Sequence, residues 1–202
     1  MSTNKLNGTI TESIGNLTKL AYLSLDNNQL GGTIPDSIQY LTKLSQLDLQ
    51  NNYISGNIPT IIGNLVSLTQ LSLNNNYLKG SIPESIRYLT YLFSLKLKGN
   101  SIGGTIPTNI GQLNFLETID LSNNNISGTI PQQLSHLTNL QFLNLQQNGL
   151  SGTIPNTISN LANLYYLDLS NNKFNGTLSV PIQNLPSLLW LDVSFNVEID
   201  PN

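Results

Sequence analysis

Asp168 and Asp192 are the residues of this chain whose type and spacing come closest to those of a catalytic pair. They lie 24 residues apart, which is also the repeat period of the sequence. We therefore expect them on adjacent strands, with Cβ atoms about 5 Å apart, close to the separation of about 5 to 5.5 Å between the carboxyl groups of retaining glycosidases. An open sheet face provides no enclosing cleft, however, and no carbonyl cage for calcium accompanies the pair. The sequence predicts neither an enzyme nor a metal site.

The single histidine, His136, offers no better route to catalysis. It falls in the same repeat column as Tyr40 and Tyr88, on the expected outer side of the repeats, and no serine–histidine–acid set can be assembled around it. The chain has no cysteine, which excludes disulfides, thiolate metal ligands and cysteine nucleophiles. We predict no catalytic residues and no cofactor.

Exposed aromatic and charged side chains are better candidates for function, as groups that bind rather than react. Aromatic residues fill the last three places of one repeat column, and exposed aromatics are typical interface anchors. For Trp190, packing against a C-terminal cap is an equal alternative. Residues two apart in a strand share a face, which adds an acidic row that favours a partner with apolar groups and Lys or Arg. The predicted ligand-binding residues are Phe142, Tyr165, Tyr166, Trp190, Asp120, Asp168, Asp192, Lys96 and Lys98.

These residues are positioned by a 24-residue repeat that does not slip along the chain. A fixed period of about 20 to 50 residues indicates a stack of similar units, none of which can bury its apolar face alone. The clearest columns are Leu17, Leu41, Leu65, Leu89, Leu113, Leu137, Leu161 and Leu185; Asn28, Asn52, Asn76, Asn100, Asn124, Asn148, Asn172 and Asn196; and Gly8, Gly32, Gly56, Gly80, Gly104, Gly128, Gly152 and Gly176.

Each column has an expected structural role. Leu23 and Leu25 are two residues apart, which is the periodicity of a strand with one face in the core, and equivalent strands of successive units run parallel. The Asn28 column is best interpreted as structural, because a buried turn leaves backbone groups that asparagine can satisfy. Glycine allows a tight turn and proline fixes φ. The apolar residues that follow proline, three apart, predict a short 3₁₀ turn.

The resulting pattern L-x-x-L-x-L-x-x-N-x-L-x-G-x-I-P resembles the plant-type leucine-rich repeat, from about Asn4 to Asn196. That subclass occurs in receptor-like kinases, receptor-like proteins and polygalacturonase inhibitors. The resemblance implies an α/β repeat solenoid: a right-handed superhelix of about eight 24-residue coils, with a parallel concave β-sheet and short 3₁₀ or helical turns on the convex side. Since the composition shows no break, we expect residues 1–202 to form one domain, without the cysteine-containing caps of extracellular relatives.

The resemblance also implies a non-catalytic module whose concave sheet binds a protein, peptide or glycan ligand. An intracellular interaction scaffold is the alternative. By resemblance the location is extracellular or at the cell surface, although the chain begins without a signal sequence. Four sequons are expected acceptors for N-glycosylation if the chain is secreted: Asn7, Asn16, Asn125 and Asn175.

Composition excludes two further classes of partner. Charged residues make up 9% of the chain and the net charge is −3, whereas a nucleic-acid ligand requires a basic stripe. No run of about 18 apolar residues occurs, so the sequence predicts no transmembrane segment.

A row of mostly threonine residues keeps one more alternative open. It consists of Thr9, Thr33, Asn57, Ser81, Thr105, Thr129, Thr153 and Thr177. Regular threonines on a flat strand are typical of ice-binding solenoids. The residue two positions further on is the proline of the buried turn, so only one rank is expected, and β-branched residues favour strands in general.

Overall fold

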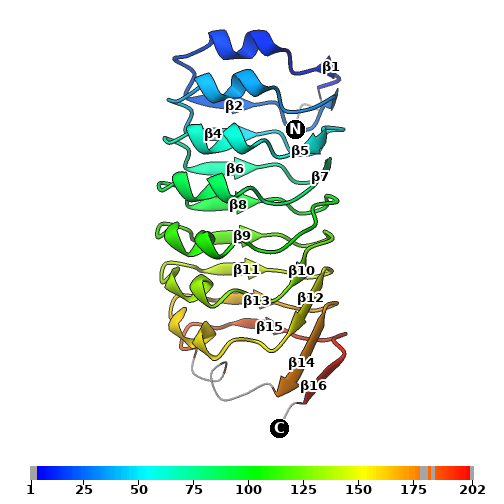
Figure 1. Cartoon of the computed structure of the whole chain (residues 1–202), viewed down its shortest axis with the longest axis vertical. Helices are drawn as coiled ribbons and strands as arrows, with labels where there is room; N and C mark the ends of the chain where they lie inside the picture. The colour runs from blue at the N-terminus through cyan, green and yellow to red at the C-terminus, as the bar shows by residue number, and fades with distance from the viewer. Residues whose placement is uncertain (1–3, 178–181, 183–184, 201–202) are drawn as a thin grey trace.

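Eight short parallel strands, one from each coil, form a continuous sheet along one side of the molecule (Figure 1). The computed structural model describes residues 4–177, 182 and 185–200. Sheet order follows chain order, as expected for a stack in which each coil pairs only with its neighbours. The strands are β2 (Tyr22–Ser24), β4 (Gln46–Asp48), β6 (Gln70–Ser72), β8 (Ser94–Lys96), β9 (Thr118–Asp120), β11 (Phe142–Asn144), β13 (Tyr166–Asp168) and β15 (Trp190–Asp192).

The sheet keeps the 24-residue register of the sequence throughout. Leu95, the middle residue of β8, pairs with Leu71 on one side and Ile119 on the other, and all three are buried. The residues before and after each middle residue lie on the opposite face of the sheet, since side chains alternate along a strand. This confirms the predicted parallel sheet and its assignment of inward and outward columns.

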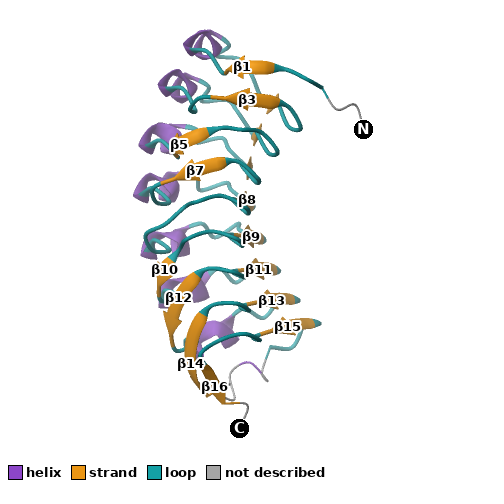
Figure 2. Cartoon of the chain, turned by 90° about the vertical axis from the view of Figure 1, so that its right-hand side faces the viewer, coloured by secondary structure: helices purple, strands orange, loops and turns teal. Residues whose placement is uncertain are grey.

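Seven 3₁₀ helices lie on the other side of the described coils (Figure 2). Each helix after the first follows a proline; Pro35 has φ −71° and accepts a hydrogen bond of 3.1 Å from the N–H of Ile38. The fixed φ of proline suits a helix start, where its missing N–H is not needed. The helices are η1 (Glu12–Asn16), η2 (Asp36–Tyr40), η3 (Thr60–Asn64), η4 (Glu84–Tyr88), η5 (Thr108–Gln112), η6 (Gln132–His136) and η7 (Asn156–Asn160).

The molecule curves so that the helices lie on its outer side and the long sheet on its inner side (Figure 2). The prediction of a repeat solenoid with a concave sheet and convex 3₁₀ turns is confirmed. We call the outward-facing surface of the eight-stranded sheet the concave face. None of the helices in the described part of the chain is long and apolar enough to cross a bilayer.

A second set of strands runs along one flank, between the helices and the long sheet (Figure 2). In the C-terminal half these strands form a parallel four-stranded sheet in the order β10-β12-β14-β16, whereas in the N-terminal half they pair only as β1-β3 and β5-β7. Their bounds are β1 (Asn7–Thr9), β3 (Gln29–Gly31), β5 (Ser55–Asn57), β7 (Tyr77–Lys79), β10 (Ser127–Gly128), β12 (Gly149–Gly152), β14 (Lys173–Thr177) and β16 (Glu198–Asp200).

The Asn28 column joins each coil to the coil before it, as Asn52 illustrates. Its side-chain Nδ2 donates to the carbonyl oxygen of Leu49 in its own coil (3.1 Å) and of Leu25 in the preceding coil (2.9 Å). Its Oδ1 accepts a hydrogen bond of 3.0 Å from the N–H of Leu30, also in the preceding coil. The asparagine thus satisfies buried backbone groups that would otherwise lack partners, which confirms its predicted structural role.

In the N-terminal coils, the asparagines that precede Asn28, Asn52 and Asn76 form a second ladder that was not predicted. Asn27, Asn51 and Asn75 have φ values of 55°, 56° and 52°, in the left-handed region that asparagine tolerates better than most residues. Their side chains hydrogen-bond to one another at 2.9 and 2.7 Å. Repeated Asn-Asn pairs in the sequence were the available signal, because asparagine is enriched where φ is positive.

Candidate functional site

Three aromatic rings stack across the C-terminal half of the concave face. Phe142 in β11, Tyr166 in β13 and Trp190 in β15 occupy register-paired positions. The ring centroids of Phe142 and Tyr166 lie 4.4 Å apart with an interplanar angle of 10°, and those of Tyr166 and Trp190 lie 6.0 Å apart at 4°. We call these three side chains the aromatic ladder. The rings line up as the strand spacing predicts, and they present their edges, not their stacked faces, to solvent.

Exposure increases along the aromatic ladder toward the C-terminal coil. Phe142 and Tyr166 are half-buried, whereas Trp190 is 54% exposed. Tyr165, one residue before β13, is also exposed, but it forms no ring contact with the aromatic ladder among the described residues. The role of these aromatic residues in binding stays a prediction.

The acidic row lies two residues beyond the aromatic ladder, on the same face, and each carboxylate closes a local turn. Asp120 Oδ1 accepts hydrogen bonds from the backbone N–H (3.1 Å) and hydroxyl (2.6 Å) of Ser122. Asp168 makes the same pair of contacts with Ser170, at 3.0 and 2.7 Å. These aspartates therefore have a structural role that the sequence analysis did not assign, through an Asp-x-Ser turn at the end of the strand.

Asp168 is buried, which corrects the expectation of an exposed carboxylate. Its side chain is 5% exposed, because it is flanked by its register partners Asn144 and Asp192 and lies beneath the hydroxyl of Tyr166. That hydroxyl is 3.4 Å from Asp168 Oδ2, a long hydrogen bond. Asp120 and Asp192 remain partly exposed, as predicted.

Three carboxylates lie close enough to the Tyr166 hydroxyl to influence its pKa. The pKa of Tyr166 is raised, first by burial of its hydroxyl and then by the nearby carboxylates of Asp168, Asp120 and Asp192. Among the described residues, no lysine or arginine forms an ion pair with these three carboxylates. Lys96 is the register partner of Asp120, so it borders the acidic row without forming an ion pair with it.

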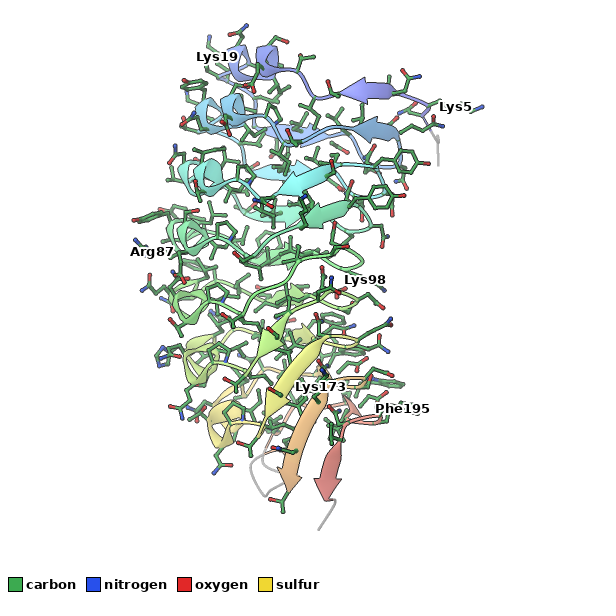
Figure 3. All side chains as sticks on the ribbon, turned by 45° about the vertical axis from the view of Figure 1, so that its right-hand side comes forward. Lys5, Lys19, Arg87, Lys98, Lys173 and Phe195 are labelled. Atoms are coloured by element: carbon green, nitrogen blue, oxygen red, sulfur yellow. The ribbon has the colours of Figure 1, made fainter. Side chains whose placement is uncertain are left out.

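Lys96 and Lys98 are both exposed near the middle of the sheet. Figure 3 places Lys98 on the side away from the helices, together with Phe195, whereas Lys19 and Arg87 lie on the helix side. The predicted lysine pair thus adjoins the acidic row at its N-terminal end. His136 is exposed at the end of η6, on the convex side, as expected.

A second aromatic cluster was missed by the sequence analysis. Tyr91 and Phe115 are exposed and stack with centroids 6.3 Å apart, at the edge where β8 and β9 begin. Together with Phe93, Thr69 and Glu117 they line a shallow hollow of about 350 Å³. The signal was present: Tyr91 and Phe115 are one period apart, as are Phe93 and Glu117.

The four predicted glycosylation sites are exposed, and all lie off the concave face. Asn7 is in β1, Asn16 ends η1, Asn125 precedes β10 and Asn175 is in β14. A glycan on any of them would therefore leave the aromatic ladder accessible. Their modification stays a prediction.

The threonine row is exposed along the flank, and its methyl groups are seated on the glycine column. A Cβ atom at Gly128, which has φ 80°, would lie 2.9 Å from the methyl group of Thr105 in the preceding coil. Both the positive φ and this close approach require glycine. Pro131, two residues after Thr129, is buried, whereas the column two residues before the threonine row is mixed and contains Lys79 and Gly103 beside Ser127, so a single rank stays the expectation.

No metal site accompanies these surfaces in the part of the chain that the structure describes. There, no group of three or more histidine, aspartate or glutamate side chains could hold a metal ion. What the concave face offers chemically is an open surface of ring edges, one tyrosine hydroxyl and uncompensated carboxylates. These groups can bind a ligand but do not surround one.

Comparison with protein families finds matches along most of the chain. A family model described as "Leucine-rich repeat region" matches residues 84–201, and two further leucine-rich repeat models match residues 1–54 and 67–89. No protein in a search of curated sequences matches the chain.

Several solved structures are similar along nearly the whole chain. The plant peptide hormone receptor RGFR1 in complex with RGF2 is 38% identical with a TM-score of 0.95, over 96% of this chain and 31% of the receptor chain. The Arabidopsis receptor kinase HAESA, in complex with the peptide hormone IDA and the co-receptor SERK1, is 38% identical with a TM-score of 0.94, over 96% of this chain and 33% of that one.

A plant ice-binding protein is 30% identical with a TM-score of 0.74, over 96% of this chain and 70% of that chain. The chain thus spans about a third of the length of the two receptor chains and more than two thirds of the ice-binding protein.

Proposed function

The chain belongs to the leucine-rich repeat family, and we propose that it is a non-catalytic recognition module that binds a peptide or protein segment on its concave face. Support comes from the similarity to receptor chains whose structures contain peptide hormones. The observation that carries the proposal is the aromatic ladder, which places three stacked aromatic side chains on consecutive strands of the concave face. We further propose that residues 1–202 act as one domain, located outside the cell or at its surface.

The open shape of the concave face favours recognition over catalysis. Its strands present one row of side chains per coil, and an extended partner laid across several coils contacts each row in turn. Large aromatic side chains contribute most to binding where the partner excludes water from them. A glycan is the alternative ligand for the same face.

Selection from a random peptide library displayed on phage tests the proposal. The wild-type chain should retain a consensus peptide, and Phe142→Ala together with Tyr166→Ala should weaken its binding by more than about 1 kcal/mol. The control is Tyr53→Ala together with Tyr77→Ala. That pair is stacked in the same manner, with centroids 5.9 Å apart and an interplanar angle of 12°, but lies on the flank.

Two outcomes would refute the assignment of this face. One is a wild-type chain that retains no consensus peptide. The other is a selected peptide that binds the aromatic-ladder double variant and the flank double variant equally well. Circular dichroism of each variant must show intact secondary structure, so that a loss of binding reports the surface and not the fold.

Ice binding through the flank is a second candidate function, favoured by one observation. Threonine methyl groups seated on glycine give the threonines of this row a uniform orientation. The similarity to a plant ice-binding protein supports the same surface. Inhibition of ice recrystallisation should be lost in Thr129→Lys and kept in Thr60→Lys, an exposed threonine in η3 on the convex side. Wild-type protein without any inhibition would exclude this function.

A further inference from the structure

We infer that the ligand segment recognised by the concave face carries a lysine or arginine side chain, which lies over Asp168 and Asp192, next to an apolar side chain that packs on Tyr166 and Trp190. This inference rests on the proposed recognition function and names the chemistry of its ligand. It also distinguishes a peptide from a glycan, the two ligand classes that this face leaves open.

The stacking of the aromatic ladder leaves a sugar ring at most one open ring face, that of Trp190. A sugar ring binds aromatic residues by lying flat on an exposed ring face. Here the facing sides of Phe142, Tyr166 and Trp190 cover one another, at centroid distances of 4.4 and 6.0 Å. What remains accessible along the sheet is a row of ring edges and one outer face of Trp190. Ring edges suit aliphatic and aromatic side chains of a partner, which pack edge-to-face.

The carboxylates beside the aromatic ladder lack a compensating cation. Asp168 and Asp192 are register partners on adjacent strands, so two negative charges lie side by side. Asp192 Oδ1 accepts the N–H of Ser194 at 2.9 Å, while its Oδ2 has no hydrogen-bond partner among the described residues. Like charges at this spacing destabilise each other, and an added cation removes that repulsion.

Burial makes the need for a cation greater at Asp168. Asp168 is 5% exposed as a residue, and the sole partner of its Oδ2 in the described part of the chain is the Tyr166 hydroxyl, at 3.4 Å. A buried carboxylate with one poorly satisfied oxygen carries a desolvation cost that a charged donor reduces. The pKa of Tyr166 is raised first by burial of its hydroxyl and then by the nearby carboxylates.

The neighbouring charges favour Asp168 and Asp192, rather than Asp120, as the place where a ligand cation binds. Asp120 lies two strands from Asp168, about 10 Å away, and its register partner is Lys96. A ligand cation at Asp120 would meet the positive charge of Lys96. At Asp168 and Asp192 no described lysine is in register, so the attraction there is not offset.

The test uses a library of random octapeptides with acetylated N-termini and amidated C-termini, so that side chains alone supply charge. The wild-type chain should enrich peptides in which lysine or arginine adjoins an aromatic or aliphatic residue. A selected peptide should bind Asp192→Asn about two- to fivefold more weakly. Its affinity for the wild type should fall as NaCl rises from about 0.05 M to about 0.5 M.

Asp48→Asn is the matched control. Asp48 occupies the same repeat column in β4, and its Oδ1 accepts the N–H of Gln50 at 3.1 Å, as Asp192 does with Ser194. In both variants the asparagine Oδ1 can keep that turn hydrogen bond. The Asp48→Asn substitution also replaces the Oδ2 that accepts a hydrogen bond of 3.2 Å from Gln50 Nε2, so any change in peptide binding is judged against its measured stability. The selected peptide should bind Asp48→Asn as tightly as the wild type.

The outcomes separate this inference from the function on which it rests. Selected peptides that lack basic residues, or that bind Asp192→Asn as tightly as the wild type, would refute the inferred lysine or arginine of the ligand. Peptide recognition by the concave face would still stand. If no peptide is retained, both fail. Trp190 is the single tryptophan of the chain, so its fluorescence reports directly on the aromatic ladder. A fluorescence change on adding cellohexaose, without any retained peptide, would assign the face to glycans.

Discussion

Replacing Asn124, a member of the Asn28 column, by aspartate should lower the free energy of unfolding and make it depend on pH. The Asn124 Nδ2 donates to the carbonyl oxygens of Leu97 (3.0 Å), Leu121 (3.1 Å) and Ser122 (3.2 Å), and its Oδ1 accepts the N–H of Ile102 (3.0 Å). An aspartate has nearly the same shape and keeps the acceptor. When ionised it has no donor, and one carboxylate oxygen then faces three carbonyl oxygens in a buried turn.

The expected magnitude follows from these contacts. Leaving a buried polar group without its partner costs about 1 to 3 kcal/mol. Asn124→Ala removes the hydrogen-bond partner of the Ile102 N–H and of the three carbonyl groups. We expect a loss of about 2 to 5 kcal/mol in the free energy of unfolding for Asn124→Ala. At neutral pH Asn124→Asp should lose at least as much, because its charge is disfavoured by burial and by the facing carbonyls.

The sign of the pH dependence follows from linkage. Disfavouring the charged form raises the pKa of the introduced carboxyl in the folded state above its unfolded value of about 3.9. Between those two pKa values the folded state binds more protons, so stability falls as pH rises through this window and is constant above it. Below the unfolded pKa the protonated carboxyl can donate one hydrogen bond, and part of the loss is recovered.

Urea melts of the variant from acid to neutral pH measure this effect. The matched control is Asn125→Asp, the next residue, which is exposed and forms no side-chain hydrogen bond in the described part of the chain. That control should follow the wild-type pH profile to within about 0.5 kcal/mol. An Asn124→Asp variant that is as stable at neutral pH as in acid would refute the structural role assigned to the hydrogen bonds that Asn124 donates.

Three further predictions test the stack itself. Leu95→Ala, at a fully buried position, should lower the free energy of unfolding by about 2 to 5 kcal/mol, whereas Gln70→Ala on the concave face should stay within about 0.5 kcal/mol; equal losses in denaturant melts would overturn the assignment of columns. Gly128→Ala places a methyl group 2.9 Å from the Thr105 methyl, at a residue with φ 80°, and should lower the free energy of unfolding by more than about 1 kcal/mol in the same assay. An unchanged melt would contradict the claim that this position requires glycine. Hydrogen exchange should be faster in residues 6–25 and 188–199 than in the central coils, because β2 and β15, at the two edges of the eight-stranded sheet, each pair with one strand only. Uniform protection along the chain would contradict this expectation.

Much of the fold could be predicted because its determinants are local and repeated. A strand of three residues has a fixed inside and outside, and the same choice recurs every 24 residues, so one correct unit determines all the others. The leucine columns, the structural asparagines and the 3₁₀ turns after proline all follow from this. Positions one residue away were harder to predict. Asn51 and its equivalents adopt positive φ, which paired asparagines indicate in several coils but not at Gln147 or Phe195.

The candidate site depended on contacts between coils, which a sequence pattern does not contain. The sequence by itself placed Phe142, Tyr166 and Trp190 in one column, but only the tertiary structure decided that their faces stack and leave edges exposed. It likewise decided that Asp168 is buried while Asp192 is not, because exposure depends on which side chains from the coils on either side fold over a residue. Column membership is a property of the chain, whereas ring orientation and burial are properties of the packed stack.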